Sequence, residues 1–253
     1  MVNEPKQNLQ DQLTDTSKSA IQRYQLLALG NTSWWYLVKY ELIVLFFSGL
    51  PGALGLILRK WFYPMILGSV GKNVIFGRGL TIRHGLKISI EDNVTIDDLS
   101  VLDAKGVGNQ GIEIEENTII SRNCVLSCKG ASIFIGKNCT LGINSIIHAR
   151  DESDVRVKDD VLCGAYCYLI GGGPFITKEL DVPFKKQGMT SKGGIVINQN
   201  VWLGSSVQVM DGITIGKGSI IGSNAVVNKP IDEYLVCGGV PVKTIKSRKN
   251  NKI

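Results

Sequence analysis

The most constraining feature of this 253-residue sequence is a six-residue repeat that runs through its C-terminal two-thirds. An aliphatic or other small apolar side chain recurs at every sixth position, and glycine follows several of these positions. Six groups of three share this spacing. They are Ile90, Ile96 and Leu102; Ile114, Ile120 and Leu126; Ile135, Leu141 and Ile147; Val157, Cys163 and Leu169; Ile197, Leu203 and Val209; and Ile215, Ile221 and Val227.

A six-residue period corresponds to a short strand followed by a sharp turn, and three such units close a triangular coil of about 18 residues. One side chain of each unit points inward, and a single coil cannot bury its own interior, so coils must stack. The sequence therefore predicts a parallel β-helix. The 27 residues between Leu169 and Ile197 are too many for a turn, which predicts a functional loop at this point.

The N-terminal third has a different character. Residues 1–20 are polar, whereas residues 33–65 are strongly apolar and predict helix, interrupted near Pro51. Three interpretations are open: a membrane-spanning helix, a cap packed on the β-helix, or a helix pair in the membrane interface. The interfacial interpretation is favoured because aromatic residues flank the apolar run on both sides and Arg59–Lys60 can meet anionic lipid. The flanking aromatic residues are Trp34, Trp35, Trp61 and Tyr63.

Charge and cysteine content exclude several functional classes. The net charge of +6 is mild and scattered, and no nucleic-acid-binding signature is present, so nucleic acid is not an expected partner. The six cysteines contain no C-x-x-C pair, and only two histidines accompany them, so we expect neither a metal site nor disulfides. Most of the cysteines fall at small apolar positions of the repeat, which predicts buried thiols. A γ-type carbonic anhydrase, whose zinc needs three histidines, is excluded by the same count.

Two C-terminal segments resemble a known family. NVWLGSSVQVMDGITIGKGSIIGSNAVVNK (200–229) and GGVPVKTIK (238–246) resemble the last coils of hexapeptide-repeat acetyltransferases, most of all the maltose, galactoside and polysaccharide O-acetyltransferases. The resemblance implies a left-handed parallel β-helix that forms a homotrimer and binds acetyl-CoA between neighbouring subunits. It covers residues 68–248, with a loop at 171–195, after an N-terminal region at 1–67 and before a basic tail at 249–253.

The resemblance also implies contacts to the acyl donor. Exposed coil edges offer polar groups to the pantetheine amides, and lysines can meet the phosphates as point charges. The positions that match are Ser205, Ser223, Asn228, Lys229, Lys243 and Lys246. The alternative is that these serines only fill small turn positions and the lysines are solvated.

The loop departs from the family at one important position. The family has a histidine near the start of this loop, where it acts as the general base, and Pro174 occupies that position here. Of the two histidines, His84 is expected to be a surface or turn residue. His148 precedes the loop by about one coil and is therefore the candidate catalytic base, with Asp151 or Glu152 near enough to orient it.

These observations predict an acetyl-CoA-dependent O-acetyltransferase acting on a sugar, glycan or glycolipid precursor, with Asn144 as a candidate acceptor contact. The alternative is a catalytically silent trimeric scaffold or binding protein that kept the β-helix and lost its base. We expect a cytoplasmic protein associated with the inner membrane face. The sequence does not identify the acceptor or distinguish O- from N-acylation.

Overall fold

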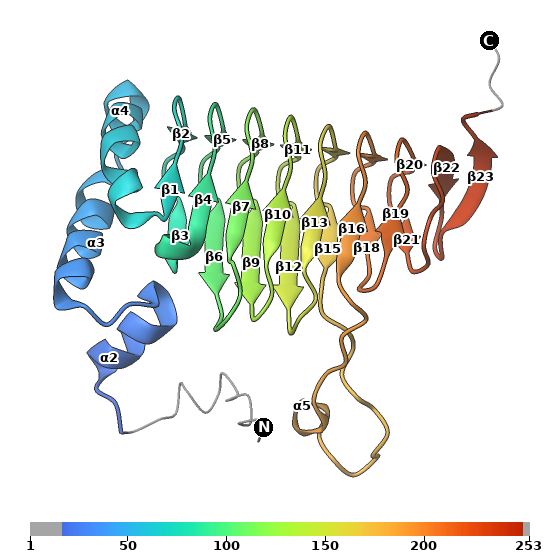
Figure 1. The fold of residues 1–253 in the computed structure, drawn as a ribbon, viewed down its shortest axis with the longest axis horizontal. Coiled ribbons are helices and arrows are strands. Elements are labelled where there is room, and N and C mark those ends of the chain that lie inside the picture. Colours follow the sequence, from blue (N-terminus) through green and yellow to red (C-terminus); the bar gives the residue numbers. More distant parts are fainter. Residues whose placement is uncertain (1–16, 250–253) are drawn as a thin grey trace.

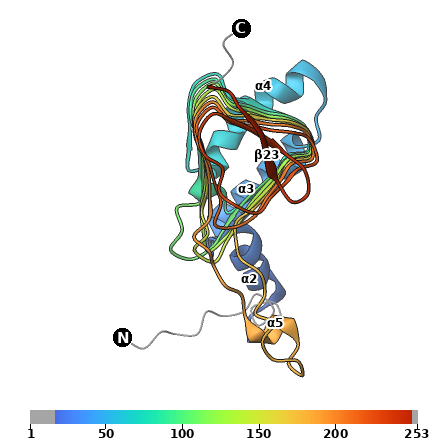
Figure 2. The same ribbon diagram turned by 90° about the vertical axis from the view of Figure 1, so that its right-hand side faces the viewer.

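The computed structural model describes residues 17–249, which form a row of helices followed by a long stack of parallel coils (Figure 1). Each coil contributes one strand to each of three sheets, A, B and C, and strands from successive coils pair in parallel. Viewed along the stack, the coils superimpose on a three-sided outline (Figure 2). The predicted parallel β-helix with an N-terminal helical segment is confirmed; its left-handed winding was inferred from the family resemblance.

Sheet A contains β1 (Ser69–Val70), β4 (Ile88–Ile90), β7 (Ile112–Ile114), β10 (Ile133–Ile135), β13 (Val155–Val157), β16 (Ile195–Ile197) and β19 (Thr214–Ile215). Sheet B contains β2 (Ile75–Phe76), β5 (Thr95–Ile96), β8 (Ile119–Ile120), β11 (Thr140–Leu141), β14 (Leu162–Cys163), β17 (Trp202–Leu203), β20 (Ile220–Ile221), β22 (Leu235–Gly238) and β23 (Lys243–Ser247). Sheet C contains β3 (Thr81–Arg83), β6 (Val101–Lys105), β9 (Val125–Lys129), β12 (Ile146–Arg150), β15 (Tyr168–Ile170), β18 (Gln208–Val209) and β21 (Val226–Val227). All of these strands pair in parallel except β22 with β23, which is antiparallel.

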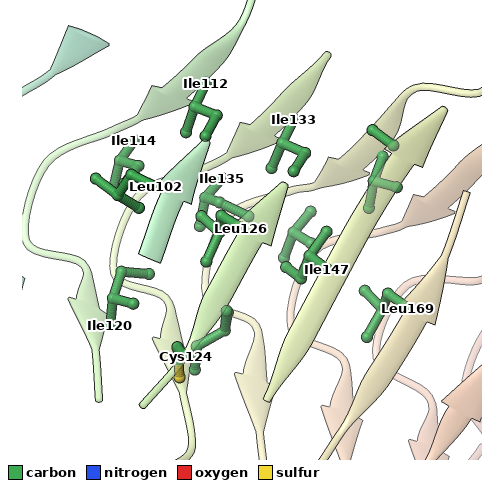
Figure 3. Close-up of a cluster of buried hydrophobic side chains, with 14 of the residues drawn as sticks. Leu102, Ile112, Ile114, Ile120, Cys124, Leu126, Ile133, Ile135, Ile147 and Leu169 are labelled. Carbon is green, nitrogen blue, oxygen red and sulfur yellow. The ribbon is translucent and has the colours of Figure 1, made fainter. Parts of the chain in front are cut away.

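The core is the inside of the coil. Every one of the eighteen repeat positions identified from the sequence is buried, with at most 2% of its surface exposed. Figure 3 shows how Leu102, Leu126, Ile147 and Leu169 of sheet C line up with isoleucines from the other two sheets. Burying a side chain of this size stabilises the fold by about 1.5–3 kcal/mol. The hexad spacing therefore reports one continuous hydrophobic core.

Asparagine side chains stabilise the turns between sheets A and B. Residues there adopt positive φ, which asparagine tolerates better than most residues. On successive coils the side-chain amide of Asn73 donates to Asn93, Asn93 to Asn117, and Asn117 to Asn138, at 3.2, 3.2 and 3.3 Å. The ladder ends where Asn138 donates to Asp160 at 3.0 Å. Sharp corners and side-chain hydrogen bonds are thus provided by one residue type.

All six cysteines are buried and free, as predicted. Their thiols replace aliphatic groups inside the coil, and burial raises the pKa of Cys124 and of Cys167 to about 11. These two thiols are therefore protonated packing groups at neutral pH.

The apolar N-terminal segment folds into short helices. These are α2 (Ala20–Tyr24), a π-helical turn η1 (Gln25–Leu29), α3 (Trp34–Phe47), α4 (Gly52–Phe62) and a 3-10 turn η2 (Tyr63–Ile66). Two further short helices, η3 (Gly85–Lys87) and α5 (Phe184–Gln187), interrupt the coils. The break between α3 and α4 falls at residues 48–51, just before and at Pro51. Within residues 17–249, no helix has the length and apolar content needed to cross a bilayer.

One face of these helices closes the N-terminal end of the β-helix. The Tyr36 and Tyr40 hydroxyls donate to the carbonyl oxygens of Ile66 and Ile82 at 3.0 and 2.6 Å. Arg59 is buried, and its guanidinium donates to the carbonyl oxygens of Phe76, Phe47 and Leu50. The interpretation of the segment as a packing cap is therefore correct for this face.

Candidate active site

The long loop between β15 and β16 projects from one corner of the β-helix and carries α5 at its tip (Figures 1 and 2). Its two arms form a narrow neck in which Phe175 pairs antiparallel with Met189. The Pro174 carbonyl accepts from the backbone N–H of Thr190 at 3.1 Å. At the tip, the Gln187 amide donates to the carbonyl oxygens of Glu179 and Val182, both at 2.7 Å. The loop is thus held by its own hydrogen bonds.

A cavity of about 430 Å³ lies where the neck meets sheet C. Strands β12 and β15 and the two residues that follow β18 form one wall, and both arms of the neck form the other. The lining residues are His148, Arg150, Tyr168, Ile170, Gly172, Gly173, Pro174, Phe175, Met189, Lys192, Met210 and Asp211.

His148 reaches this cavity because side chains alternate along β12. Ile147 and Ala149 point into the core, so His148 and Arg150 point outward. His148 pairs in register with Ile170, the last residue of β15 before the loop begins. Its ring contacts Tyr168 edge to face, with centroids 6.1 Å apart. The expectation that His148 lies on the rung next to the loop is confirmed, whereas its catalytic role stays a prediction.

The surroundings of His148 favour its neutral form. Burial lowers the pKa of the imidazole below its ordinary value of 6.5, and the positive charge of Arg150 lowers this pKa further. A neutral imidazole at pH 7 can accept a proton from an incoming hydroxyl group.

The carboxyl group in this cavity comes from Asp211, which the sequence analysis did not single out. Its two oxygens accept the backbone N–H groups of Lys192 and Gly194 at 2.6 and 3.0 Å. Asp211 therefore fixes the returning arm of the loop to the coil below it. Asp151 and Glu152, proposed from the sequence to orient His148, occupy the turn after β12 and do not line the cavity.

The six predicted acyl-donor contacts fall into separate groups. Ser205 and Ser223 are exposed at the same corner, between sheets B and C, on consecutive coils. Lys243 pairs with Gly238 of β22, which packs against Gly222 next to Ser223. These three residues therefore share an edge. By contrast, the exposed Asn228 and Lys229 follow β21 at the other end of sheet C, and Lys246 pairs with Val236 farther along β22.

The two remaining sequence candidates lie outside the cavity. Asn144 adopts φ 59° in the turn before β12, a conformation that suits asparagine without any ligand. His84 does occupy a turn, as expected, but it is not a surface residue, since only 6% of it is exposed. Its Nε2 lies 3.2 Å from the carbonyl oxygen of Leu26 and its Nδ1 lies 3.5 Å from Asp103, so it packs the N-terminal helices onto the first coils.

Within residues 17–249 there is no cluster of three His, Cys, Asp or Glu side chains that could hold a metal ion. The polar side chains that line the cavity are those of His148, Arg150, Tyr168, Lys192 and Asp211, beside the backbone of the loop neck.

Comparison with known proteins agrees with this architecture. The family model described as bacterial transferase hexapeptide (six repeats) matches residues 194–229. The putative lipopolysaccharide biosynthesis O-acetyl transferase WbbJ of Escherichia coli is 31% identical over 153 residues, which cover 51% of this chain and 78% of WbbJ. The chain belongs to the hexapeptide-repeat acetyltransferase family.

Other relatives match over shorter parts. The galactoside O-acetyltransferase of Escherichia coli is 35% identical over 46% of this chain and 55% of its own length. The probable acetyltransferase Rv3034c of Mycobacterium tuberculosis is 32% identical over 50% of this chain and 41% of its own length. The chain thus spans about half the length of these two relatives. A mutant of AntD, an N-acyltransferase from Bacillus cereus, shares the fold with 20% identity and a TM-score of 0.51 over 73% of this chain and 85% of its own.

Proposed function

We propose that this protein transfers an acetyl group from acetyl-CoA to a hydroxyl group of a sugar or glycan precursor, with His148 as the general base. The observation that carries this proposal is that His148 lines the cavity at the loop neck together with Pro174. Pro174 occupies the position at which the family has its catalytic histidine. A histidine from the adjacent rung can therefore act as the base in the same part of the cavity.

In the reaction, the neutral imidazole of His148 accepts the proton of the acceptor hydroxyl while the hydroxyl oxygen attacks the thioester carbonyl carbon. The C–S bond breaks, and the CoA sulfur leaves and takes up a proton from the imidazolium. Burial of the ring and the positive charge of Arg150 favour the unprotonated imidazole before the acceptor arrives.

The acyl donor would bind along the coil edges beyond the cavity. Ser205, Ser223 and Lys243 offer exposed hydroxyl and ammonium groups on one edge, which suits the amides and phosphates of CoA. Asn228, Lys229 and Lys246 are proposed contacts from the other ends of the same last coils. Asn144 remains a proposed acceptor contact at the corner that precedes β12.

Kinetics of point variants test these assignments. His148→Ala should lower the transfer rate about 10²- to 10⁴-fold with little change in acetyl-CoA affinity, because the acyl donor is held by other coils. Lys229→Ala and Lys243→Ala should raise the KM for acetyl-CoA with a smaller effect on kcat. The measurement is transfer of labelled acetyl groups to a panel of hexoses and amino sugars. Transfer by His148→Ala at the rate of the parent would show that His148 is structural.

The second candidate function is a trimeric scaffold that no longer catalyses transfer, which Pro174 in the family's histidine position favours. The scaffold hypothesis predicts that the parent protein binds acetyl-CoA but acetylates no member of the acceptor panel. The same assay therefore decides between the two functions.

We also propose a homotrimer. The outer face of sheet B carries a row of apolar side chains in register on alternate or successive strands, and each is close to half exposed. They are Ile75 (48%), Ile119 (45%), Leu162 (47%) and Trp202 (50%). Burial of this row against neighbouring copies would remove it from water in a closed cyclic assembly.

The free face of the N-terminal helices is proposed to contact the cytoplasmic side of a membrane. It exposes large apolar side chains on both α3 and α4 that the β-helix does not cover. They include Trp34, Trp35, Leu42, Leu45, Phe46, Leu54 and Trp61, each at least 48% exposed. Tryptophan beside aliphatic residues is typical of helices that lie in the headgroup region.

Vesicle sedimentation tests this contact. The double variant Trp35→Ser/Leu45→Ser should lose binding to vesicles of phosphatidylglycerol and phosphatidylcholine and keep the thermal stability of the parent, because both residues are at least 74% exposed. Deleting the segment would be less informative, since its other face covers the end of the core. Equal sedimentation of the variant and the parent would contradict a lipid contact through these helices.

A further inference from the structure

Three basic side chains form a column on the outer face of sheet C. Lys105 of β6 pairs in register with Lys129 of β9, and Lys129 pairs in register with Arg150 of β12. Neighbouring strands are about 4.8 Å apart, so the three cationic side chains start from adjacent positions. We call Lys105, Lys129 and Arg150 the basic column. Gly172 continues the column as the next residue along the coil stack, and it lies against Arg150.

In the part of the chain that the structure describes, the positive charges of the basic column are not neutralised by ion pairs with acidic side chains. Within residues 17–249 none of its members forms an ion pair, and the Arg150 Nε is buried without a hydrogen-bond partner. The acidic side chains nearby are Asp103, which pairs with Arg83 at 3.8 Å, and Asp151 in the turn after β12. Asp211 lines the same cavity as Arg150, and its carboxylate accepts two backbone N–H groups.

Like charges in register repel one another. Partial burial lowers the pKa of both lysines, and the charge of Arg150 lowers that of Lys129 further. Such a cluster gains most from an anion that bridges its members.

The basic column also ends at the proposed catalytic group. Arg150 follows His148 by two residues on the same face of β12, and both line the cavity with Lys192. Two residues of a strand span about 6.6 Å, which is the scale of one hexose ring. An acceptor whose anionic group contacts Arg150 would therefore present its ring to His148.

We propose that the basic column binds the phosphates of a sugar diphosphate, so that the acceptor is a hexose carried on a diphosphate rather than a free sugar. Arg150 is the residue suited to a bidentate phosphate contact, with Lys129 and Lys105 as successive point charges. This inference rests on the proposed acetyl transfer for the identity of the reacting group, but the anion site itself does not.

The position of the basic column leaves room for the group attached to the diphosphate, the carrier of the hexose, to extend away from the cavity. In Figures 1 and 2 the helix α2 and the loop with α5 project on the same side of the β-helix. The ends of β6, β9 and β12 lie between them in Figure 1. The shared chemistry fits two sources, a nucleoside diphosphate or a lipid diphosphate whose chain extends toward the N-terminal helices.

Binding of inorganic pyrophosphate to the full chain tests the site without catalysis. Titration calorimetry at low salt should show binding to the parent, and pyrophosphate should raise its Tm. The double variant Lys129→Ala/Arg150→Ala should bind about tenfold or more weakly, because two charged contacts are lost. The matched control Lys72→Ala/Lys158→Ala removes the same charge from exposed turns between sheets A and B and should bind like the parent.

Competition then identifies the carrier. A uridine diphosphate hexose and a polyprenyl diphosphate hexose in phosphatidylcholine vesicles are each tested for displacement of pyrophosphate and as acceptors, with the free hexose as reference. The diphosphate forms should be acetylated with a KM at least about tenfold lower than that of the free hexose, and the column variant should lose this difference.

Two results would overturn the inference: a parent that binds neither pyrophosphate nor either diphosphate hexose, or a folded column variant that binds them as the parent does. Pyrophosphate binding that depends on the column, without acetylation of any acceptor, would support the anion site and contradict the proposed transferase activity instead. Circular dichroism of the variant confirms folding, and Lys129→Arg/Arg150→Lys provides a second variant that should retain measurable binding.

Discussion

At the scale of single residues, the environment of His148 determines what this site can do. Strand alternation turns its ring outward, and the loop neck then covers it, so a side chain on an exposed face becomes half-buried. Burial and the nearby Arg150 both disfavour the imidazolium form. Our proposal is that this histidine on the sheet face acts in place of the family's histidine on the loop.

The pH dependence of transfer follows from this environment. Because the pKa of His148 is lowered, the ring stays neutral to a lower pH than an ordinary histidine, and the acid limb of kcat/KM should have its midpoint below 6.5. Removing the nearby charge in Arg150→Gln should raise that midpoint, even if the acceptor KM also rises. Rates measured from pH 4.5 to 8 provide the check. An acid limb at or above 6.5 in the parent would mean that another group controls the rate.

At the scale of elements, the loop depends on a few contacts where it joins the coil. Gly173 has no room for a side chain, because a Cβ there would lie 1.7 Å from the Thr190 carbonyl oxygen. On the returning arm, Asp211 holds two backbone N–H groups from a position on the adjacent coil. Contacts at the base of the neck therefore fix the position of the loop segment that covers His148.

Asp211→Ala should make the loop segment that covers His148 more mobile without unfolding the coil. Displacement of a positioning element by about 1 Å can cost about 10²-fold in rate, so we expect kcat to fall about 10- to 100-fold with the KM for acetyl-CoA unchanged. Trypsin should also cleave faster at Lys178, Lys185 and Lys186 in the loop. Asp92→Ala is the matched control, because Asp92 accepts a backbone N–H in the same way at 2.6 Å, far from the loop. Normal transfer by Asp211→Ala would contradict a positioning role.

At the scale of the whole molecule, the strands of the β-helix form their backbone hydrogen bonds with strands of neighbouring coils. The outer face of sheet B nevertheless leaves apolar side chains exposed to water. A neighbouring copy is the simplest way to cover a row that extends over several coils. The long loop projects beyond the coil outline in both views, so it has the reach to meet a neighbour (Figure 2).

Light scattering should therefore give the mass of a trimer, measured with mild detergent to shield the N-terminal helices. Leu162→Glu/Trp202→Glu should dissociate it, because each glutamate would place a charge inside the apolar contact. The control variant Thr214→Glu places a charge on the exposed face of sheet A, outside this row, and should have a smaller effect. A monomeric parent would contradict the trimer.

The sequence by itself determined the coil. A period of six can be seen in one chain because each coil buries one side chain per hexad, and contacts between coils repeat that spacing. The buried cysteines, the loop after Ile170 and the helical N-terminal segment followed from the same local rules. His148 could be placed next to the loop because rungs are counted along the chain.

Only the tertiary structure decided which groups meet. The column of Lys105, Lys129 and Arg150 joins residues more than twenty positions apart through strand register, and loop insertions of different length hide that register from the sequence period. Asp211 reaches the loop from the following coil for the same reason. The N-terminal helices likewise present one covered and one exposed face, because their contact with the end of the core depends on where the chain bends after α3. The local period of six indicates which side chains are buried. The register between stacked coils determines which outward side chains become neighbours.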